Sequence, residues 1–425
     1  MFKLSPLVLA TTALCAAPLA FSGSYVNGTQ SSSMNQAAET GNASNYAHIS
    51  GNTLGYASGN IAANVAGGLQ NQQANTTGIA SSGTGGSGSA ATAYMTTGQV
   101  GLLNYALNMN GNNLSVLQGA ALAHASGNLG VNIASGVFNQ QRNSMSLASQ
   151  ANGGGAYATA FTGQDNIMNG NFSMYMFNYV LLENYALAYA TGNIGVNMAS
   201  GLSNQQNNSL SVASSTNKSY APHGVMSSAQ VYTNQVLKGL PSTYALDTMG
   251  NRAMMDGSVL AHASGNIGVN VAAGALNQQG NNTALSNLAD QSGSVDTASS
   301  GFDVAQTSML NVGSAIGVTN DANIEGNVAA HASGNVAINM AVGVGNQQQN
   351  GLTLANVASK AAMVSATAPV MQQAAFNSGT MIDSSYANAG LSGNALRGAT
   401  GNISVNIAAG EGNQQANVLA IASAQ

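Results

Sequence analysis

The stretch GNIGVNVAAGALNQQGN, from Gly265 to Asn281, decides the fold. When Gly265 is counted as position 0, positions 2, 4 and 6 are Ile267, Val269 and Val271, with polar or small residues between them. Apolar residues at every second position indicate a β-strand, because successive side chains of a strand point to opposite faces. An amphipathic helix would need a spacing of three and four residues. The stretch therefore predicts a strand, a turn and a second strand.

The same pattern recurs six times along the 425 residues, and internal repetition of this kind is typical of stacked architectures. Corresponding glycines are 65 to 73 residues apart. We delimit the six repeats as residues 59–79, 127–147, 192–212, 265–285, 334–354 and 401–421. The intervening linkers have about 44–52 residues and vary in sequence.

The recurring side chains of repeats two to six are the candidate self-assembly core. Aliphatic side chains occupy positions 2, 4 and 6 and form the first group, which comprises Leu129, Val131, Ile133, Ile194, Val196, Ile267, Val269, Val271, Val336, Ile338, Ile403, Val405 and Ile407. Amide side chains occupy positions 12, 14 and 16 and form the second group, which comprises Asn139, Gln141, Asn143, Asn204, Gln206, Asn208, Asn277, Gln279, Asn281, Asn346, Gln348, Asn350, Asn413, Gln415 and Asn417. Matched amides in stacked layers form hydrogen-bonded ladders.

Position 9 is Gly in every repeat, and a recurrent Gly after a strand marks an arc with unusual backbone angles. These arc glycines are Gly68, Gly136, Gly201, Gly274, Gly343 and Gly410. Position 20 is aliphatic in every repeat, as in Leu285, so the second strand also alternates. We expect the aliphatic side chains of the first strand to pack against those of the second.

The predicted fold class is all-β, with six stacked strand–Gly arc–strand layers in a β-solenoid or a Greek-key, cross-β-like arrangement with variable linkers. One repeat buries about five aliphatic side chains, worth roughly 1.5–3 kcal/mol each. Ordering about 20 residues costs roughly 1–2 kcal/mol per residue, so a single repeat is not expected to fold alone. Some linkers end in strand-like sequence, which allows layers of three or four strands.

Charge is nearly absent, since Asp, Glu, Lys and Arg make up 4% of the chain against about 25% in typical soluble proteins. Within positions 0 to 20 of all six repeats the charged residues are Arg142 and Glu411. Identical stacked layers would bring like charges into contact, so their scarcity favours stacking. The net charge of −5 offers no basic patch for nucleic acid.

Residues 1–22 have the pattern of a secretory signal peptide, with Lys3 before an apolar run and small residues near Ser22. Residues 23–58 form an N-terminal segment before the first repeat. The apolar run is short for a membrane anchor. Cys15 is the chain's one cysteine, so no disulfide is expected after cleavage. We expect export through the periplasm to the cell surface or medium.

The sequence offers no catalytic, cofactor-binding or metal-binding constellation, so we predict no enzyme, no cofactor and no small-molecule substrate. Carboxylates are scattered, and no phosphate loop or nucleophile elbow is present. His124, His262 and His331 share one position, three residues before a repeat, where Tyr56 and Tyr189 stand in two other copies. Exchange of His for Tyr favours a column of stacked rings over a metal site.

The stretch from Gly265 to Gln279 resembles the repeats of the Fap-type functional amyloids of pseudomonads, and its logic is similar to that of curli repeats. The resemblance implies an extracellular cross-β fibre that stiffens biofilm and is exported through a dedicated outer-membrane pore. The main fibre subunit of that family has fewer repeats and a cysteine pair near its C-terminus. This chain has six repeats and ends at Gln425 without such a pair.

Two functions remain open on the sequence. The first is a secreted structural protein that self-assembles into an amyloid-like fibre for biofilm matrix and surface adhesion. Its partners would be further copies of itself, an export pore and minor fibre subunits. The second is a monomeric β-solenoid adhesin. Solenoids need atypical terminal repeats as caps. The sixth repeat reaches within five residues of Gln425, and we interpret this as favouring the fibre.

Overall fold

The computed structural model describes residues 21–39, 43–83, 90–151, 154–217, 225–239, 244–247, 250–290, 295–310, 312–316, 318–358, 361–375, 377–382 and 386–424. The signal-peptide prediction therefore lies outside the described residues except for Phe21 and Ser22, which begin the first strand. The described chain is all-β, and its strands form four sheets. Among these residues there is no helix whose length and hydropathy would let it cross a membrane.

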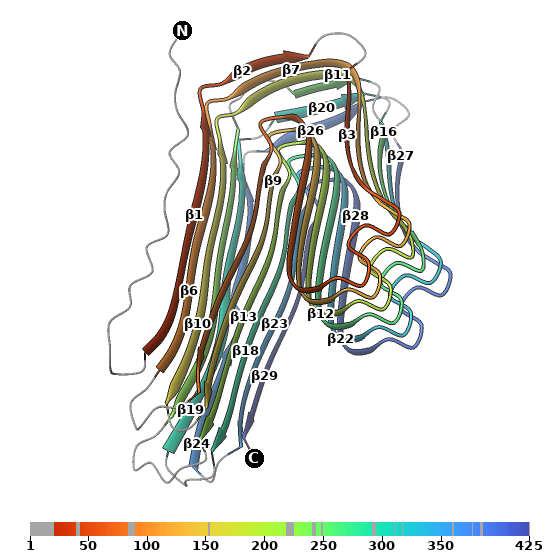
Figure 1. Ribbon diagram of the computed structural model, residues 1–425. Helices are drawn as coiled ribbons and strands as arrows, with labels where there is room; N and C mark the ends of the chain where they lie inside the picture. Colours follow the sequence, from red (N-terminus) through yellow and green to blue (C-terminus); the bar gives the residue numbers. More distant parts are fainter. Residues whose placement is uncertain are drawn as a thin grey trace.

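The repeats build two of the sheets, one for each arm of the motif (Figure 1). The first-arm sheet contains β4 (Ser58–Leu69), β8 (Ser126–Val137), β12 (Thr191–Leu202), β17 (Ser264–Ala275), β22 (Ser333–Val344) and β28 (Thr400–Glu411). The second-arm sheet contains β5 (Gln72–Ser82), β9 (Gln140–Ala151), β13 (Gln205–Asn217), β18 (Gln278–Asp290), β23 (Gln347–Ala358) and β29 (Gln414–Ala424).

The segments before each repeat build the other two sheets, in keeping with the extra linker strands that the sequence allows. The outer sheet contains β1 (Phe21–Ser33), β6 (Ala90–Leu102), β10 (Gly155–Ile167), β14 (Met226–Lys238), β19 (Val295–Met309), β24 (Ala361–Thr367) and β25 (Val370–Ala375). The cap sheet contains β2 (Gln36–Glu39), β3 (Ala43–Ile49), β7 (Tyr105–Leu117), β11 (Gly170–Asn184), β15 (Tyr244–Asp247), β16 (Gly250–Gly257), β20 (Val312–Ile316), β21 (Thr319–Ile324), β26 (Ser378–Ile382) and β27 (Tyr386–Leu391).

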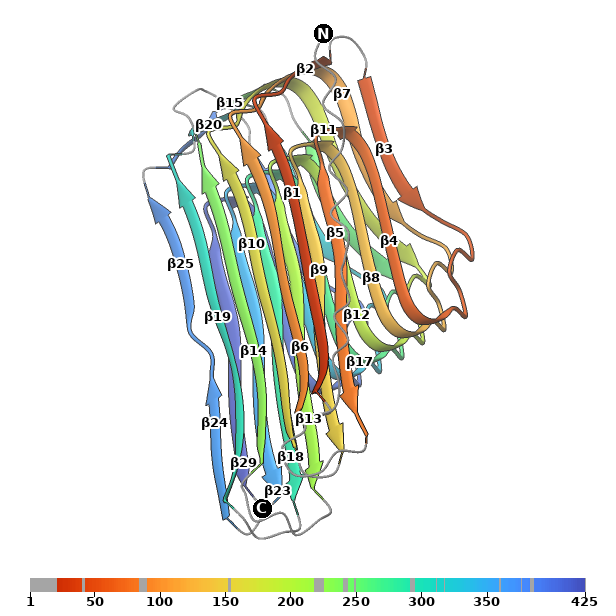
Figure 2. The same ribbon diagram turned by 60° about the vertical axis from the view of Figure 1, so that its left-hand side comes forward.

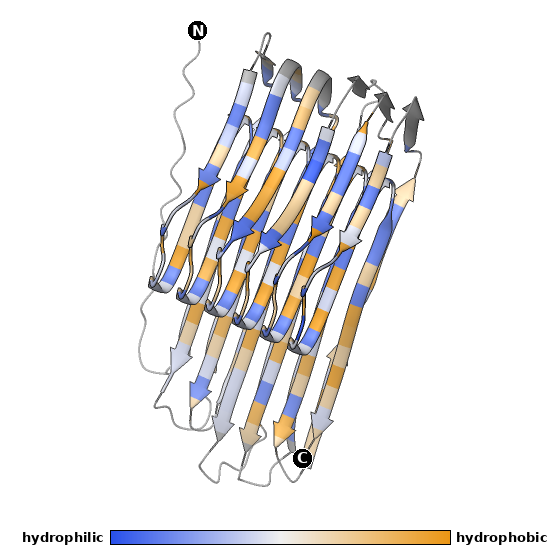
Figure 3. Cartoon of the chain, turned by 90° about the vertical axis from the view of Figure 1, so that its right-hand side faces the viewer, coloured by the Kyte–Doolittle hydropathy of each residue, from blue (hydrophilic) through white to orange (hydrophobic). Residues whose placement is uncertain are grey.

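Each layer is one linker followed by one repeat, and the chain winds through it as a spiral. The outer strand leads into the cap strand, a corner turn follows, and the two arms fold back inside, so that the second arm lies between the outer and first-arm sheets (Figures 1 and 2). The six layers span residues 21–83, 90–151, 154–217, 225–290, 295–358 and 361–424. Figure 3 shows them side by side with corresponding segments in rows.

Every strand ladder of the described chain is parallel and joins one layer to the next. Asn193 of β12 pairs with Asn266 of β17 on one side and with Asn128 of β8 on the other. Strands of one layer therefore contact each other through side chains, while hydrogen bonds of the backbone run along the stack. The predicted all-β stack of six layers is confirmed, in its solenoid form.

The position-9 glycines adopt the unusual backbone angles that the sequence predicts, but they do not form the turn. Gly136, for example, has φ = 98° and lies inside β8. The turn itself comes two residues later, where Phe138 has a left-handed φ of 57°. Gly is needed at position 9 because a Cβ there would meet the backbone carbonyl of the next layer, that of Gly201 in this case. The close approach of layers thus requires this glycine.

Candidate self-assembly core

The aliphatic column of the first arm is buried, but it packs against a different partner from the one expected. Val131, Val196 and Val269 are fully buried in one cluster with Leu122 and Leu187 of the corner turns. Cap-sheet residues such as Leu182 complete this cluster. Among the described residues it contains no aliphatic side chain of a second arm. The prediction that the two arms share an apolar interior is wrong, because the linker supplies the apolar partner.

The burial of the predicted aliphatic residues decreases toward the end of the stack. Those of the inner layers are buried, namely Leu129, Val131, Ile133, Ile194, Val196, Ile267, Val269, Val271, Val336 and Ile338. Ile403, Val405 and Ile407 of the sixth layer are partly buried and pack against the same cluster. The aliphatic column therefore runs through the described layers, and its side chains in the sixth layer are partly exposed to solvent.

Amide side chains fill the space between the two arms. Strand alternation turns positions 3 and 5 of the first arm toward the second arm, and position 5 is Asn in every repeat. Nδ2 of Asn270 donates to Oδ1 of Asn197 in the preceding layer (2.9 Å) and to Oδ1 of Asn208 across the arc (3.0 Å). The position-16 amide closes the network, since Nδ2 of Asn281 donates to Oδ1 of Asn270 (3.0 Å).

The predicted amides at positions 12, 14 and 16 all lie in ladders along the stack. At position 12, Asn204 Nδ2 donates to Asn139 Oδ1 (3.0 Å). At position 14, Gln206 Nε2 donates to Gln279 Oε1 (2.8 Å) and to the carbonyl oxygen of Met198 (2.8 Å). The remaining links of the three ladders join Asn277, Asn346, Asn413, Gln141, Gln348, Gln415, Asn143, Asn208, Asn281, Asn350 and Asn417.

Further amide ladders lie outside the predicted candidate residues, and two of them are formed by glutamines. Position 13 carries a Gln in each repeat, and Gln205 Nε2 donates to Gln140 Oε1 (2.9 Å). In the outer sheet, Gln164 Nε2 donates to Gln99 Oε1 (2.9 Å) and to the backbone oxygen of Gln206 in the second arm (3.1 Å). The outer-sheet ladder runs through Gln30, Gln99, Gln164, Gln235, Gln306 and Gln372. Its signal was present in the sequence, since these glutamines recur at the repeat spacing.

The arc glycines form their own column. All six have positive φ, between 93° for Gly68 and 110° for Gly201. A Cβ on Gly136, Gly201, Gly274 or Gly343 would meet the carbonyl of the following layer. Gly410 has no such neighbour within the described chain, where the nearest atom is the Cβ of Ala387.

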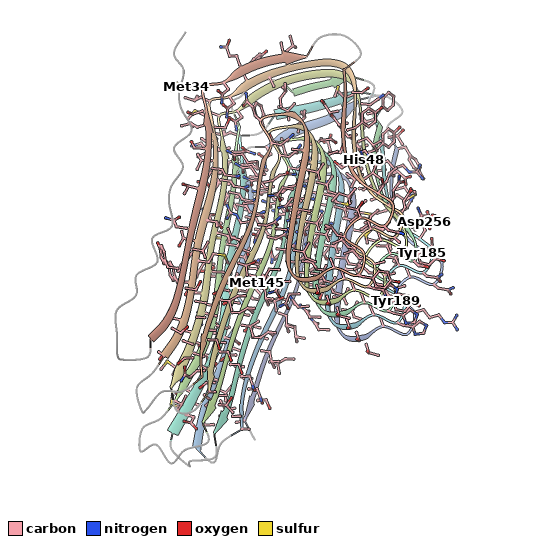
Figure 4. The ribbon with its side chains drawn as sticks, viewed as in Figure 1. Met34, His48, Met145, Tyr185, Tyr189 and Asp256 are labelled. Carbon is pink, nitrogen blue, oxygen red and sulfur yellow. The ribbon has the colours of Figure 1, made fainter. Side chains whose placement is uncertain are left out.

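The His and Tyr residues of the corner turns are stacked, as the alternation predicts. Ring centroids of Tyr56, His124, Tyr189 and His262 follow one another at 4.8 to 4.9 Å, and His331 follows at 5.1 Å. Each ring residue has a left-handed φ near 57°. Figure 4 shows Tyr189 at the outer edge of the corner turns. In the described part of the chain no group of three His, Cys, Asp or Glu residues could hold a metal ion.

The two charged residues of the repeats differ in setting. Arg142 is fully buried between the second-arm and outer sheets, and its guanidinium donates to the carbonyl oxygens of Thr97 (2.9 Å) and Gly163 (2.7 Å). Burial lowers its pKa to about 9, against the opposing effect of Asp165. Glu411 ends the first arm of the sixth layer, and burial raises the pKa of its carboxyl.

A groove with a volume of about 270 Å³ runs along the stack between the start of the first arm and the middle of the second. It is lined by amide, hydroxyl and apolar side chains such as Asn193, Met145 and Leu210, and by no acid, base or thiol. Figure 4 shows Met145 between the two arms, where it lines this groove. The groove therefore offers hydrogen-bonding groups and apolar surface.

The sequence is similar to those of known proteins. The chain matches the functional amyloid protein FapB/FapC family over residues 23–215, 147–242 and 228–424. It is 32% identical over 265 residues to the functional amyloid subunit FapC of Pseudomonas aeruginosa. The aligned region covers 57% of this chain and 76% of that protein. No solved structure matches.

Proposed function

The chain belongs to the FapB/FapC family of functional amyloid proteins, and on that premise we propose that it is a fibre subunit whose copies stack end to end. The added copy would extend all four sheets by the same register that joins one layer to the next. The observation that carries this proposal is the set of amide ladders, which pass through all six layers and reach the outermost strands.

The direction of these ladders supports a head-to-tail arrangement. At position 12 each Nδ2 donates toward the N-terminal layer, as from Asn413 to Asn346 (2.8 Å). The position-14 ladder runs the other way, since Gln348 Nε2 donates to Gln415 Oε1 (2.8 Å). A second copy placed by translation continues both directions. Two copies joined by equal ends would set donors against donors, which leaves buried amide groups unpaired at about 1–3 kcal/mol each.

The biological setting follows from the family premise and the N-terminal signal. We expect secretion through the periplasm and an outer-membrane export pore, and a role of the fibre in biofilm matrix and surface adhesion. Minor fibre subunits of related sequence would share the same layer register. The alternative is a monomeric solenoid adhesin, which the intramolecular stack also permits.

Seeded assembly tests the proposal. Purified residues 23–425 are diluted from denaturant, Thioflavin T fluorescence is followed with and without sonicated seeds, and fibre diffraction is recorded. We expect seeded growth and reflections near about 4.7 and about 10 Å. A soluble β-rich monomer that never seeds would contradict the fibre and favour the adhesin.

A matched pair of variants tests whether growth occurs at the layer ends. Asn417→Lys places a charge on the position-16 ladder of the sixth layer, where the next copy would dock. Asn234→Lys places the same charge on the exposed face of β14 in an inner layer. We expect Asn417→Lys to slow seeded elongation about tenfold or more while the monomer remains β-rich, and Asn234→Lys to have little effect. Equal rates would exclude docking through the sixth layer.

A further inference from the structure

A second apolar column lies at the arc, at position 10 of the repeats. Val137 and Leu202 are buried there with the outer- and cap-sheet residues Leu237 and Met176. Leu69 of the first layer and Val344 of the fifth pack against the same cluster. The members at position 10 are Leu69, Val137, Leu202, Ala275, Val344 and Glu411. The column is thus aliphatic in five layers and ends in a carboxyl.

Glu411 lies directly over the apolar column, because β28 pairs with β22 so that Glu411 is opposite Val344. One face of Glu411 therefore adjoins the column and the other faces the position where a further layer would lie. If a second copy continues the register, the residue brought opposite Glu411 is Leu69, since Leu69 is the position-10 member of the first layer.

The two end layers carry few other charges. In the described part of the sixth layer, Arg397 of the corner turn is the other charged residue. In the described part of the first layer the charged or titratable residues besides tyrosines are Glu39 on β2 and His48 on β3. Glu39 lies two residues after Ala37, which is in register with the cluster member Ala106. Among the described residues of the two end layers, the basic side chains are His48 on β3 and Arg397 in a corner turn, and neither stands at position 10.

We propose that the sixth-layer face is an acid-favoured docking surface for the first layer of a second copy, with Glu411 as the residue that sets the pH dependence. This inference rests on the proposed end-to-end stacking and adds its regulation. Docking moves the Glu411 carboxyl from a half-buried setting to one between Val344 and Leu69. Burial of an unpaired carboxylate is costly, whereas the protonated acid is tolerated far better.

The sign of the pH dependence follows from linkage. Burial in the free end already raises the pKa of Glu411, and no charged neighbour opposes this. Docking removes more water and raises that pKa further, so docking takes up protons. The junction is strongest below the pKa of the free end and weakens as the pH rises from there to the pKa of the docked state.

The test compares elongation of preformed seeds at about pH 7.5 and about pH 5 for the wild-type chain and for Glu411→Gln. We expect wild-type elongation to be about tenfold faster at the lower pH, which corresponds to about one unit of pKa change on docking. Glu411→Gln should elongate at nearly equal rates at both pH values. Glu411→Leu, which restores the aliphatic column, should be fast at both.

The control is Asp303→Asn, which removes one negative charge from an exposed position of β19 in an inner layer. It alters the net charge of the chain by the same amount as Glu411→Gln, so it separates the local effect from general charge repulsion. We expect it to keep the wild-type pH dependence. If Glu411→Gln also keeps it, or if the wild type shows none, this inference is overturned while the fibre stands. Failure of every variant to seed at either pH would instead overturn the proposed function.

Discussion

Arg142 differs in charge from its neighbours in the stack. The same position holds Asn207 in the next layer and Gln349 in the fifth, so a guanidinium stands in a column of neutral side chains. Its Nε has no hydrogen-bond partner within the described chain, and burial depresses its pKa. The folded protein therefore holds this group at a cost that the unfolded chain does not have.

Arg142→Gln is expected to stabilise the protein. Removal of the buried cation also removes its desolvation penalty. Replacement of buried ion pairs by apolar residues of similar volume is neutral or stabilises by about 1–4 kcal/mol, and we expect a gain within that range here. The wild-type penalty is present in full below about pH 9 and falls as the pH rises above 9, because the unfolded chain then binds more protons than the folded one. The stability difference between variant and wild type should therefore shrink from pH 7 to about pH 10.5. Denaturant midpoints at several pH values measure it.

The control for this prediction is Arg397→Gln, which removes an exposed guanidinium from a corner turn. We expect the free energy of unfolding to change by no more than about 0.5 kcal/mol. A destabilised Arg142→Gln variant would show that the two hydrogen bonds to backbone carbonyls outweigh the desolvation of the cation.

Val269→Asp is expected to prevent folding or assembly. Val269 is fully buried in the aliphatic column, with Val196 and Ile338 as its neighbours along the stack. A carboxylate there has no partner, and an uncompensated buried charge costs roughly 3–5 kcal/mol. Asn234→Asp introduces the same group on the exposed face of the same layer and should be nearly neutral. Circular dichroism and seeded growth compare them, and equal behaviour would contradict the buried column.

At the scale of elements, the arc glycine is the feature with the sharpest test. Gly201 has φ = 110°, and a Cβ there would meet the carbonyl oxygen of Gly274. Gly163 lies in the same layer with no atom within 4 Å of an added Cβ. We expect Gly201→Ala to destabilise by about 1–3 kcal/mol and Gly163→Ala to be neutral or slightly stabilising. Equal denaturant midpoints of the two variants would show that the layers can move apart at the arc without a loss of stability.

The sequence predicts the arms well and the linkers poorly, for a physical reason. Both arms must repeat closely, because amide ladders and the arc glycine require the same residue in each layer, as with Gln206 and Gly201. The outer strand needs only alternation and one recurrent Gln, such as Gln164, so its sequence varies. The sequence therefore allows extra linker strands in the layer but does not identify the outer strand. Nor does it identify the corner turns and the cap sheet as the partners of the aliphatic column. The stacked rings of His124 and Tyr189 were predictable because their exchange preserves shape.

At the scale of the whole molecule, the stack is nearly one-dimensional, since each layer pairs only with the layers before and after it. Stability in such proteins is approximately a sum of layer terms and interfaces between neighbours. The repeat register is what the chain must keep, and the identity of a particular inner layer matters less. A deletion should therefore be tolerated when it removes a whole number of layers and should not be tolerated when it removes part of a layer.

Deletion of residues 225–290 removes one complete layer and is expected to leave a five-layer stack. Residues 154–217 would then pair with residues 295–358, and the ladders would pass from Asn204 to Asn346 and from Gln164 to Gln306, whose side chains match. The variant should remain β-rich, unfold at a lower denaturant concentration and still be seeded by wild-type fibres, since both end layers are unchanged. Deletion of residues 225–257 removes half a layer and leaves β18 without an outer strand to cover it. That variant should lose the Gln235 link and the buried amide pairing across the sheets, and should not be seeded. If both deletions behave alike, the layer is not the unit in which this chain folds and assembles.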